Sequence, residues 1–303
     1  MPAHNRPEQL ERAARSVLDQ HGIPVELIIV DDASTDTTPD VVARLAEEPA
    51  VTVLRNEVST GPSGARNRGI EKANGDYLAF CDDDDEWLPG AAALLVGDLE
   101  SKPDVGAVTS WHQVVHSERN TPVEYRGPTG FGANELLWFN FVALPFGVIR
   151  RNAFAGDIRF DTDLRGNEDW DLWLRCAQER PFGVMPRILY RYHQHGGVRV
   201  TGARDALAAG QQKFLDKHRH AMSAACVTYH VALIANLRSG RPAMLRALRV
   251  EALRDPAGAA AAAAVLSAGF AASALARRRH DPGLPARVMR RMVARPVPAA
   301  AAR

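Results

Sequence analysis

The chain has 303 residues, of which 46% are hydrophobic and 24% are charged. This is the balance of an ordinary globular protein, and it excludes a chain that is disordered throughout. The net charge of +1 hides an asymmetry: residues 1–240 carry 25 Lys and Arg against 33 Asp and Glu, and residues 241–303 carry 12 Arg against 3 acids. A basic tail on an acidic body suggests an anionic surface as the tail's partner, and excludes a protein that binds nucleic acid along its whole length.

The first 110 residues alternate between two hydrophobic periods. Short apolar runs predict buried strands over residues 25–30, 51–54, 76–80 and 105–115. Helical patterns lie beside them, each opening with a proline in its first turn, over residues 7–20, 39–47, 62–73 and 89–100. Strands and helices that alternate with short connections predict an α/β domain with a mostly parallel sheet flanked by helices.

The start of this pattern is irregular. A helix that begins near Pro7 should follow a strand, yet only Met1, Pro2 and Ala3 precede the loop. We therefore expect the first strand to be truncated. Loss of a central parallel strand is costly, because it leaves the backbone groups of two neighbours unpaired.

The second half of the chain is mostly helical in pattern. Residues 167–178 predict a helix with Trp170 and Trp173 on its core face, and residues 201–303 predict a helical, basic C-terminal extension. Residues 256–276 run without a charge, but alanine is nearly neutral for membrane insertion, so a packed or membrane-surface helix is favoured over a span. His112 and His116 alternate with apolar residues and are expected on a strand surface.

Cellular location is predicted from the cysteines and the N-terminal charges. The three cysteines, at positions 81, 176 and 226, show no CxxC pair and no zinc spacing. Charges between His4 and Arg12 interrupt any apolar run, so no signal peptide is expected. We expect a cytoplasmic protein, with peripheral contact to the cytoplasmic face of a membrane through its basic C-terminal region.

Five consecutive acids, Asp82 to Glu86, directly follow the predicted strand over residues 76–80. Their charges repel one another and raise their pKa values. A hard divalent cation relieves this repulsion, and carboxylate oxygens suit Mn²⁺ or Mg²⁺. The alternative is a solvated acidic turn whose charges complement the dipole of the next helix.

The position of the acids favours a ligand site. Asp31 and Asp32 also follow a predicted strand directly, as does Asn56. Ligands of open α/β sheets sit at the carboxyl ends of the strands, so these side chains are expected on one rim. Carboxylates there can bind ribose hydroxyls or a base N–H, while a metal holds a diphosphate.

At this point the sequence resembles the family 2 glycosyltransferases, which are inverting enzymes of the GT-A fold that use nucleotide-diphosphate sugars. The resemblance covers about residues 1–200 and rests on five motifs in the right order. They are P-x-x-N-R at residues 2–6, V-D-D-x-S-x-D at 30–36, N-x₄-G-x₃-A-R-N-x-G at 56–69, D-x-D at 82–84, and an acidic E-D signature at 168–169. It implies one GT-A domain over residues 1–200, followed by the extension over 201–303.

The resemblance also implies residue roles. The nucleotide pocket would comprise Pro2, Ala3, His4, Asn5, Asp31, Asp32, Arg66, Asp82 and Asp83. Asp84 would ligate the metal, with His193 or His195 approaching the metal or the diphosphate; of the two, we assign His195. Asp169 would be the general base. The donor would be a nucleotide-diphosphate sugar, with UDP favoured over dTDP or GDP.

The chemistry follows from the bond that is broken. The leaving diphosphate must be neutralised, the acceptor hydroxyl needs one carboxylate to take its proton, and a single displacement inverts the anomeric carbon. The acceptor could be a glycan, a lipid-linked sugar or a small natural product.

Three alternatives stay open. In the first, Glu168 and Asp169 only complement a helix dipole behind Asn167. The chain could be a nucleotidyltransferase of a related fold, although no Gly-rich loop with an Arg follows its first strand. It could also be a non-catalytic relative that binds a nucleotide or a glycan.

Overall fold

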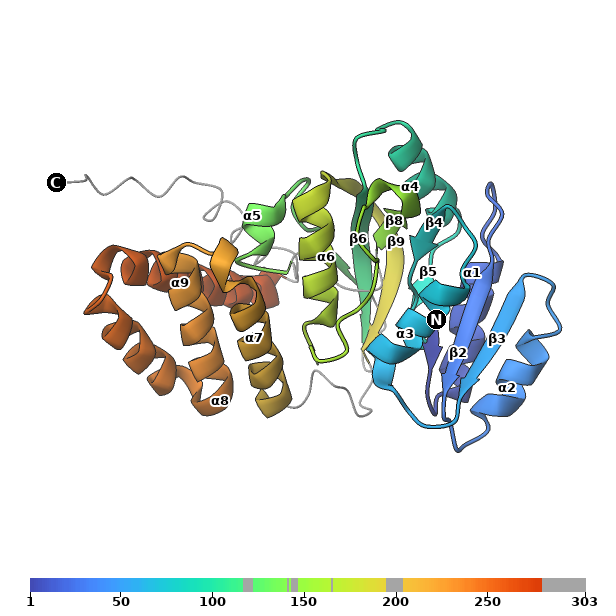
Figure 1. Cartoon of the computed structure of the whole chain (residues 1–303), viewed down its shortest axis with the longest axis horizontal. Helices are drawn as coiled ribbons and strands as arrows, with labels where there is room; N and C mark the ends of the chain where they lie inside the picture. Colours follow the sequence, from blue (N-terminus) through green and yellow to red (C-terminus); the bar gives the residue numbers. More distant parts are fainter. Residues whose placement is uncertain (117–121, 141, 143–146, 165, 195–203, 280–303) are drawn as a thin grey trace.

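The computed structural model describes the chain except for residues 117–121, 141, 143–146, 165, 195–203 and 280–303, and it does not describe the side chains of residues 269–279. Figure 1 shows an elongated molecule. The strands β1 to β3 lie near one end, the helices α7 to α9 lie at the other, and α6 stands between them.

The first sheet is parallel and has the order β1-β2-β3, formed by Pro2–Ala3, Leu27–Asp32 and Val51–Asn56. Every residue of β2 is buried. Leu27 and Ile29 pack with α1 (Pro7–Leu18) and α2 (Thr38–Leu45), whereas Ile28 and Val30 pack with Ala65 of α3 (Gly61–Lys72). Helices on both faces explain why this strand is a continuous apolar run.

The second sheet has the order β4-β8-β6-β9-β5, and β7 pairs with β6. Its strands are Tyr77–Ala79 (β4), Glu86–Trp87 (β5), Ala107–His116 (β6), Val123–Tyr125 (β7), Gly147–Arg150 (β8) and Phe182–Gln194 (β9). The long β6–β9 ladder is parallel, and the short ladders of β4, β5, β7 and β8 are antiparallel. The predicted α/β fold with a mainly parallel sheet flanked by helices is confirmed.

Helix α4 (Ala91–Glu100) begins later than the sequence predicts. Pro89 was expected in its first turn, but Gly90 follows with φ +77°, in the left-handed region that glycine tolerates best. The helix therefore starts only at Ala91. The other three N-terminal helices begin within a residue of their predicted starts.

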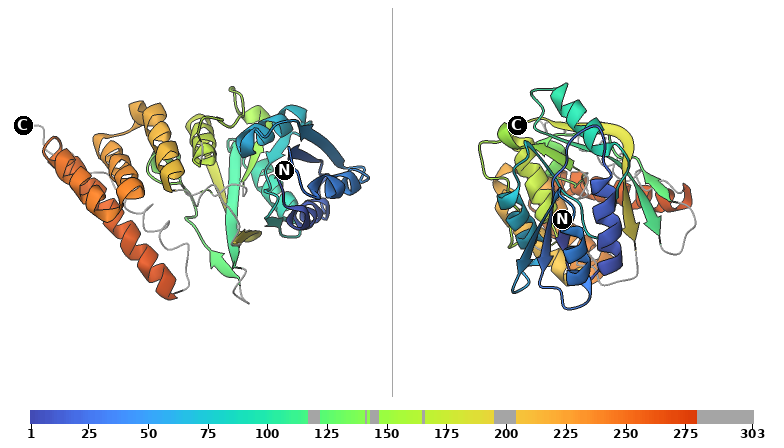
Figure 2. Two further views of the ribbon diagram at one scale, coloured as in Figure 1. Left: turned by 90° about the horizontal axis from the view of Figure 1, so that it is seen from below. Right: turned by 90° about the vertical axis from the view of Figure 1, so that its right-hand side faces the viewer.

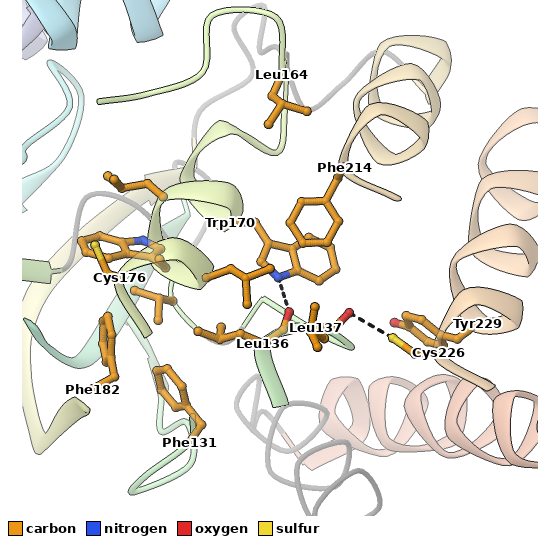
Figure 3. Packing of buried hydrophobic residues seen from close by; sticks show 14 of the residues in the cluster. Phe131, Leu136, Leu137, Leu164, Trp170, Cys176, Phe182, Phe214, Cys226 and Tyr229 are labelled. Atoms are coloured by element: carbon orange, nitrogen blue, oxygen red, sulfur yellow. Dashed lines mark hydrogen bonds between the residues drawn. The ribbon is translucent and has the colours of Figure 1, made fainter. Parts of the chain in front are cut away.

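The C-terminal helices share a hydrophobic core with the second sheet. They are α5 (Ala133–Leu136), α6 (Glu168–Glu179), α7 (Arg204–His218), α8 (Ala224–Ala252) and α9 (Pro256–Arg279), with short 3₁₀ turns at Arg151–Ala153 and Arg219–Ala221. Figure 3 shows Trp170 stacked on Phe214, with ring centroids 4.3 Å apart. Trp170 and Trp173 are buried, as predicted. Figure 2 shows α7 to α9 stacked side by side beyond α6.

The structure tests the predictions for His112 and for a membrane-spanning helix. His112 was expected on a strand surface, but it is buried: its ring stacks on Tyr125 at 4.5 Å and meets Tyr192 edge-on. Burial lowers its pKa to about 3. Among the described residues, no helix is both long enough and apolar enough to cross a bilayer.

A buried carboxylate fastens α6 to α7. Asp171 is fully buried, and its oxygens accept hydrogen bonds from His218 Nε2 at 2.8 Å and Arg175 Nε at 2.9 Å and pair with Lys217 Nζ at 2.9 Å. Burial alone acts to raise the pKa of Asp171, but the contacts with His218, Lys217 and Arg175 outweigh it and hold the pKa well below its usual value. The position of α6 therefore depends on a charged contact with the C-terminal helices.

We predict that Asp171→Asn lowers the free energy of unfolding by about 3 kcal/mol at pH 7, because it removes the buried carboxylate that pairs with Lys217 and Arg175 and accepts from His218. Since the folded-state pKa is depressed, this stabilisation is complete above the unfolded pKa of about 4 and fades as pH falls below it. Urea unfolding between pH 7 and pH 2.5 measures the difference. Asp163→Asn, at an exposed position on the preceding loop, is the matched control. An Asp171→Asn protein as stable as this control at pH 7 contradicts the prediction.

Candidate active site

The carboxyl ends of β2 and β3 carry three buried polar side chains. Asp32 accepts hydrogen bonds from Asn56 Nδ2 at 2.6 Å, Thr60 N at 2.9 Å and Gly61 N at 2.8 Å. Burial acts to raise its pKa, but these donors outweigh burial and lower it. Asp32 therefore orders the loop between β3 and α3. Asp31 accepts a hydrogen bond from Ser34 N at 3.0 Å and pairs with Arg55.

The loop after β1 lies against this rim. His4 Nδ1 is 2.8 Å from the carbonyl oxygen of Asp32, and Asn5 N donates to Ser34 Oγ at 3.1 Å. Asn5 has φ +52°, a left-handed conformation that asparagine accepts more readily than most residues. Pro2 and Ala3 pair with Val30 and Asp31 in β2, so residues 2–5 and Asp31–Asp32 form one contiguous wall.

The acid run after β4 divides into two groups. Ligand oxygens of Asp82, Asp84 and Asp85 all lie within 4.8 Å of one another and could hold a cation. Asp83 points to the β1 loop, where it accepts hydrogen bonds from His4 N at 3.1 Å and Arg6 Nη1 at 2.8 Å. Burial raises the pKa of Asp83 to about 6, and the neighbouring Asp84 adds to the rise.

Cations compensate this concentration of acids. Arg6 Nη1 bridges Asp83 at 2.8 Å and Asp84 at 3.1 Å. Glu86, the last acid of the run, contacts other partners: its Oε1 lies 2.9 Å from Arg12 Nε and 2.6 Å from His193 Nε2. These cations offset part of the negative charge of the acid run, and opposite charges at this distance favour the ionised form of its carboxylates.

Arg66 of α3 joins the acid run to the start of α6. Its side chain is buried, and its Nη2 donates to Asp82 Oδ1 at 2.6 Å. Its Nη1 lies 3.7 Å from Glu168 Oε1, and its guanidinium stacks over the ring of Phe160 at 5.3 Å. One buried cation thus brings the metal-binding candidates and the acidic signature of α6 to the same place.

Asp169 lies in the first turn of α6 and is half-buried. Its Oδ1 accepts a hydrogen bond from Trp170 N at 2.7 Å, and Asn140 Nδ2 donates to Oδ2 at 3.3 Å. Asn167 occupies the N-cap position, but its side chain makes no capping hydrogen bond. Asp169 therefore has both a helix N-terminus and a side-chain donor to orient its carboxylate.

The structure describes one of the two histidines that the sequence suggests near the metal. His193 N donates to Asp85 Oδ1 at 3.0 Å, so β9 reaches the acid cluster at this residue. His195, assigned to the metal from the sequence, lies outside the described residues. Arg6 and Asn140 reach the site without a predicted role. The sequence offers a signal for Arg6, because a lone arginine beside the β1 loop can pair with an acid run. Nothing in the sequence near Asn140 points to its contact with Asp169.

Comparison with known proteins identifies the family. The family model described as Glycosyl transferase family 2 matches residues 1–158. The GalNAc(5)-diNAcBac-PP-undecaprenol beta-1,3-glucosyltransferase of Campylobacter jejuni is 28% identical over 68% of this chain and 68% of its own. The putative colanic acid biosynthesis glycosyl transferase WcaA of Escherichia coli is 26% identical over 80% of this chain and 88% of its own.

Two solved structures share the fold. TarS of S. aureus in complex with UDP-GlcNAc has a TM-score of 0.64 at 16% identity, covering 95% of this chain and 88% of its own. The mannosyltransferase PcManGT of Pyrobaculum calidifontis, in complex with GDP-Man and Mn²⁺, has a TM-score of 0.58 at 21% identity, covering 97% of this chain and 84% of its own. The α/β fold, the match over residues 1–158 and the rim of acids agree: the chain belongs to glycosyl transferase family 2 and is a glycosyltransferase.

Proposed function

We propose that the protein transfers a sugar from a nucleotide-diphosphate sugar to an acceptor hydroxyl, with a divalent cation, by a single inverting displacement. The observation that carries the proposal is the buried contact of Arg66 with Asp82 and Glu168, because it unites the acid cluster with the start of α6. Solved relatives bind UDP-GlcNAc, or GDP-Man with Mn²⁺, which supports this class of donor.

The donor site is proposed at the rim. Residues Pro2 to Asn5, with Asp31 and Asp32, bind the nucleoside, and Asp82 and Asp83 bind its ribose side. Asp84 and Asp85, with Asp82, offer the hard oxygen ligands that Mn²⁺ or Mg²⁺ prefers, at mutual distances that suit one ion. A bound cation supplies charge neutralisation for the departing diphosphate. Arg6, which shares Asp84 with that site, keeps the acids compensated.

The acceptor side is proposed at α6. Asp169 takes the proton from the acceptor hydroxyl while the acceptor oxygen attacks the anomeric carbon from the face opposite to the leaving group. The Asn140 contact fixes the orientation of the Asp169 carboxylate. Arg66 lies between the two sides and holds Asp82 and Glu168 in place, and no second carboxylate nucleophile is needed for an inverting transfer.

Donor binding is tested first by thermal unfolding with UDP, GDP and dTDP, each with and without Mn²⁺. A ligand that binds only the folded state at about 100 times its Kd stabilises it by about 2.7 kcal/mol, which we expect to raise the Tm by roughly 5 °C. We expect one nucleotide to dominate and its shift to require Mn²⁺. Asp84→Asn should lose the metal-dependent part, while Asp163→Asn keeps it. A cooperative unfolding transition that no nucleotide moves would sink the donor site.

The base assignment is tested with Asp169→Asn, which keeps the shape of the side chain and removes its basicity. We expect turnover of the nucleotide sugar selected above to fall by about 10²–10⁴-fold, with donor affinity unchanged. Turnover and the Kd for the donor are measured on the same preparations, with Asp163→Asn as the control. Unchanged turnover removes Asp169 as the base. Intact donor binding by a wild type that never turns over favours the non-catalytic alternative, and cleavage between the phosphates favours the nucleotidyltransferase.

We further propose that the second half of α8 rests on an anionic membrane surface. Helix α8 is kinked at Gly240, which has non-helical backbone angles, and beyond the kink its exposed face mixes apolar with basic side chains. Leu245, Val250 and Leu253 are 45%, 51% and 88% exposed, and the exposed residues Arg241, Arg246, Arg249 and Arg254 lie among and beside them. Apolar side chains that enter the headgroup region and arginines that pair with acidic lipids bind such a surface together.

Flotation tests this contact. It compares vesicles of phosphatidylcholine alone with vesicles that also contain about 30% phosphatidylglycerol, an anionic lipid near which each basic residue contributes ~1 kcal/mol. Arg246→Glu with Arg249→Glu should weaken binding to the anionic vesicles by roughly 30-fold or more at the same energy per charge. Lys72→Glu with Arg187→Glu makes the same change of net charge at exposed positions of α3 and β9 and should bind as the wild type does. Equal binding to both kinds of vesicle, or equal loss in both double variants, contradicts the proposal.

A further inference from the structure

A cavity of about 340 Å³ lies between the second half of α8 and helix α9, at the end of the molecule away from β1 to β3 (Figure 1). Met244, Leu248 and Leu266 line it and are buried. Ala263 and Leu245 line it as well, and Leu245 is 45% exposed, so the cavity reaches the surface. A largely apolar lining and a volume of this size are typical of pockets that bind small ligands.

The sequence explains why the two helices leave this space. Gly240 has φ +76° and Pro242 has no N–H for the helical ladder, so α8 is kinked here and its second half turns away from the axis of the first. Met244 and Leu248 lie one turn apart on the same face of that half. On α9, Ala263 offers only a methyl group to the space beside them. Because protein interiors leave few voids larger than a water molecule, an apolar space of this size suits an apolar occupant.

The polar part of the cavity lining is cationic. Arg241 and Ser267 complete the lining, and both residues are exposed. Arg241 precedes Leu248 by about 10 Å along the helix, so the charge lies toward one end of the cavity and Leu248 toward the other. Within the described part of the chain, Arg241 makes no hydrogen bond or ion pair, and no carboxylate lines the cavity. An uncompensated guanidinium beside an apolar space fits a ligand with an anionic head and an apolar tail.

We propose that this cavity binds one hydrocarbon chain of an anionic phospholipid, with the lipid phosphate against Arg241. The free charge of Arg241 selects an anionic lipid over a neutral apolar ligand. Leu245 selects a lipid of a membrane, because it belongs both to the cavity and to the face of α8 that is proposed above to rest on one. The inference extends that proposed contact, which itself needs no cavity, and it is independent of the proposed sugar transfer.

The length of the cavity sets the length of chain that it can bury. The ~10 Å from Arg241 to Leu248 corresponds to about eight carbon atoms of an extended chain, at roughly 1.2 Å per bond. Each buried methylene should tighten binding by about fourfold. Affinity should therefore rise steeply up to about eight carbon atoms and change little beyond. A chain that lies on an open apolar surface would instead gain affinity with every added methylene.

The experiment titrates the full chain with butyl, hexyl, octyl, decyl and dodecyl phosphate, each below its critical micelle concentration. EDTA is present, so that no metal ion recruits the phosphate to the acid cluster. The methyl NMR resonance of Met244 reports binding at the cavity in protein labelled at its methionine methyl groups, and Met244→Leu assigns that resonance. Isothermal titration calorimetry gives the Kd.

Matched ligands separate the head from the chain. We expect affinity to level off near octyl phosphate, and octylphosphocholine, which has the same chain but no net charge, to bind roughly fivefold more weakly. Inorganic phosphate should leave the Met244 resonance unshifted, because it has no chain to enter the cavity.

Two pairs of variants test the contacts. Arg241→Gln should weaken the binding of octyl phosphate by roughly fivefold, whereas Arg238→Gln makes the same change of charge at an exposed position outside the cavity lining and should bind as the wild type does. Ala263→Phe fills the space and should abolish binding, whereas Ala264→Phe, at the exposed neighbouring position, should retain it. The Tm of each variant shows that it is folded.

A Met244 resonance that no alkyl phosphate shifts overturns the proposal. Affinity that keeps rising through dodecyl phosphate, or that is equal within either pair of variants, overturns it too, because the lipid would then lie outside the cavity or away from Arg241. A resonance that moves with protein concentration alone also overturns it, since a second copy would then be the occupant. Binding of the wild type to anionic vesicles without these responses would leave the membrane contact standing, so the two proposals fail separately.

Discussion

The arrangement of the site depends on Arg66, a buried cation between two acidic segments. Its guanidinium bonds to Asp82 after β4 and lies 3.7 Å from Glu168 at the start of α6. Neither acidic segment could approach the other without it, since like charges in a poorly solvated place repel strongly. Burying the cation is itself costly, and the energy comes from paired carboxylates and the face of Phe160. The fold brings α3, the loop after β4 and the start of α6 together, so that Arg66 can offset the charges of both acidic segments.

The C-terminal helices support the acceptor side of the site from behind. The carbonyl oxygen of Leu137, just after α5, accepts hydrogen bonds from His230 Nε2 at 2.7 Å and from Cys226 Sγ at 3.3 Å, and Figure 3 shows the second of these. The other ring nitrogen of His230 meets Gln211 at 2.7 Å. Burial lowers the pKa of His230 to about 4, so the ring stays neutral near pH 7 and both of its bonds persist. Leu137, close to Asn140 in sequence, is thus held by residues 89 and 93 positions further along the chain.

The sequence predicted the features that depend on residues close together in the chain. The run Leu27 to Val30 ends in two acids, and this alone places Asp31 and Asp32 at a strand end. Burial of His112 was missed because its stacking partner, Tyr125, comes from a neighbouring strand that no local period reveals. The contact of Asn140 with Asp169 likewise depends on how α5 packs on α6. The sequence places Asp32 at a strand end, but no local pattern shows that its oxygens also accept hydrogen bonds from Thr60 N and Gly61 N, almost thirty residues later.

The fold separates the acidic and basic parts of the chain in space. The acidic body contains a rim whose carboxylates already outnumber their arginine partners, so a doubly charged diphosphate meets repulsion there unless a cation accompanies it. Helix α8, whose second half carries Arg241, Arg246 and Arg249, lies at the end of the molecule away from β1 to β3 (Figure 1). An anionic surface therefore attracts one end and repels the other, which turns the molecule without any specific contact. Net charge near zero and a large charge separation together favour an oriented encounter over a tight one, and in the membrane contact proposed above the exposed Leu253 beside Arg254 would add an apolar contribution to it.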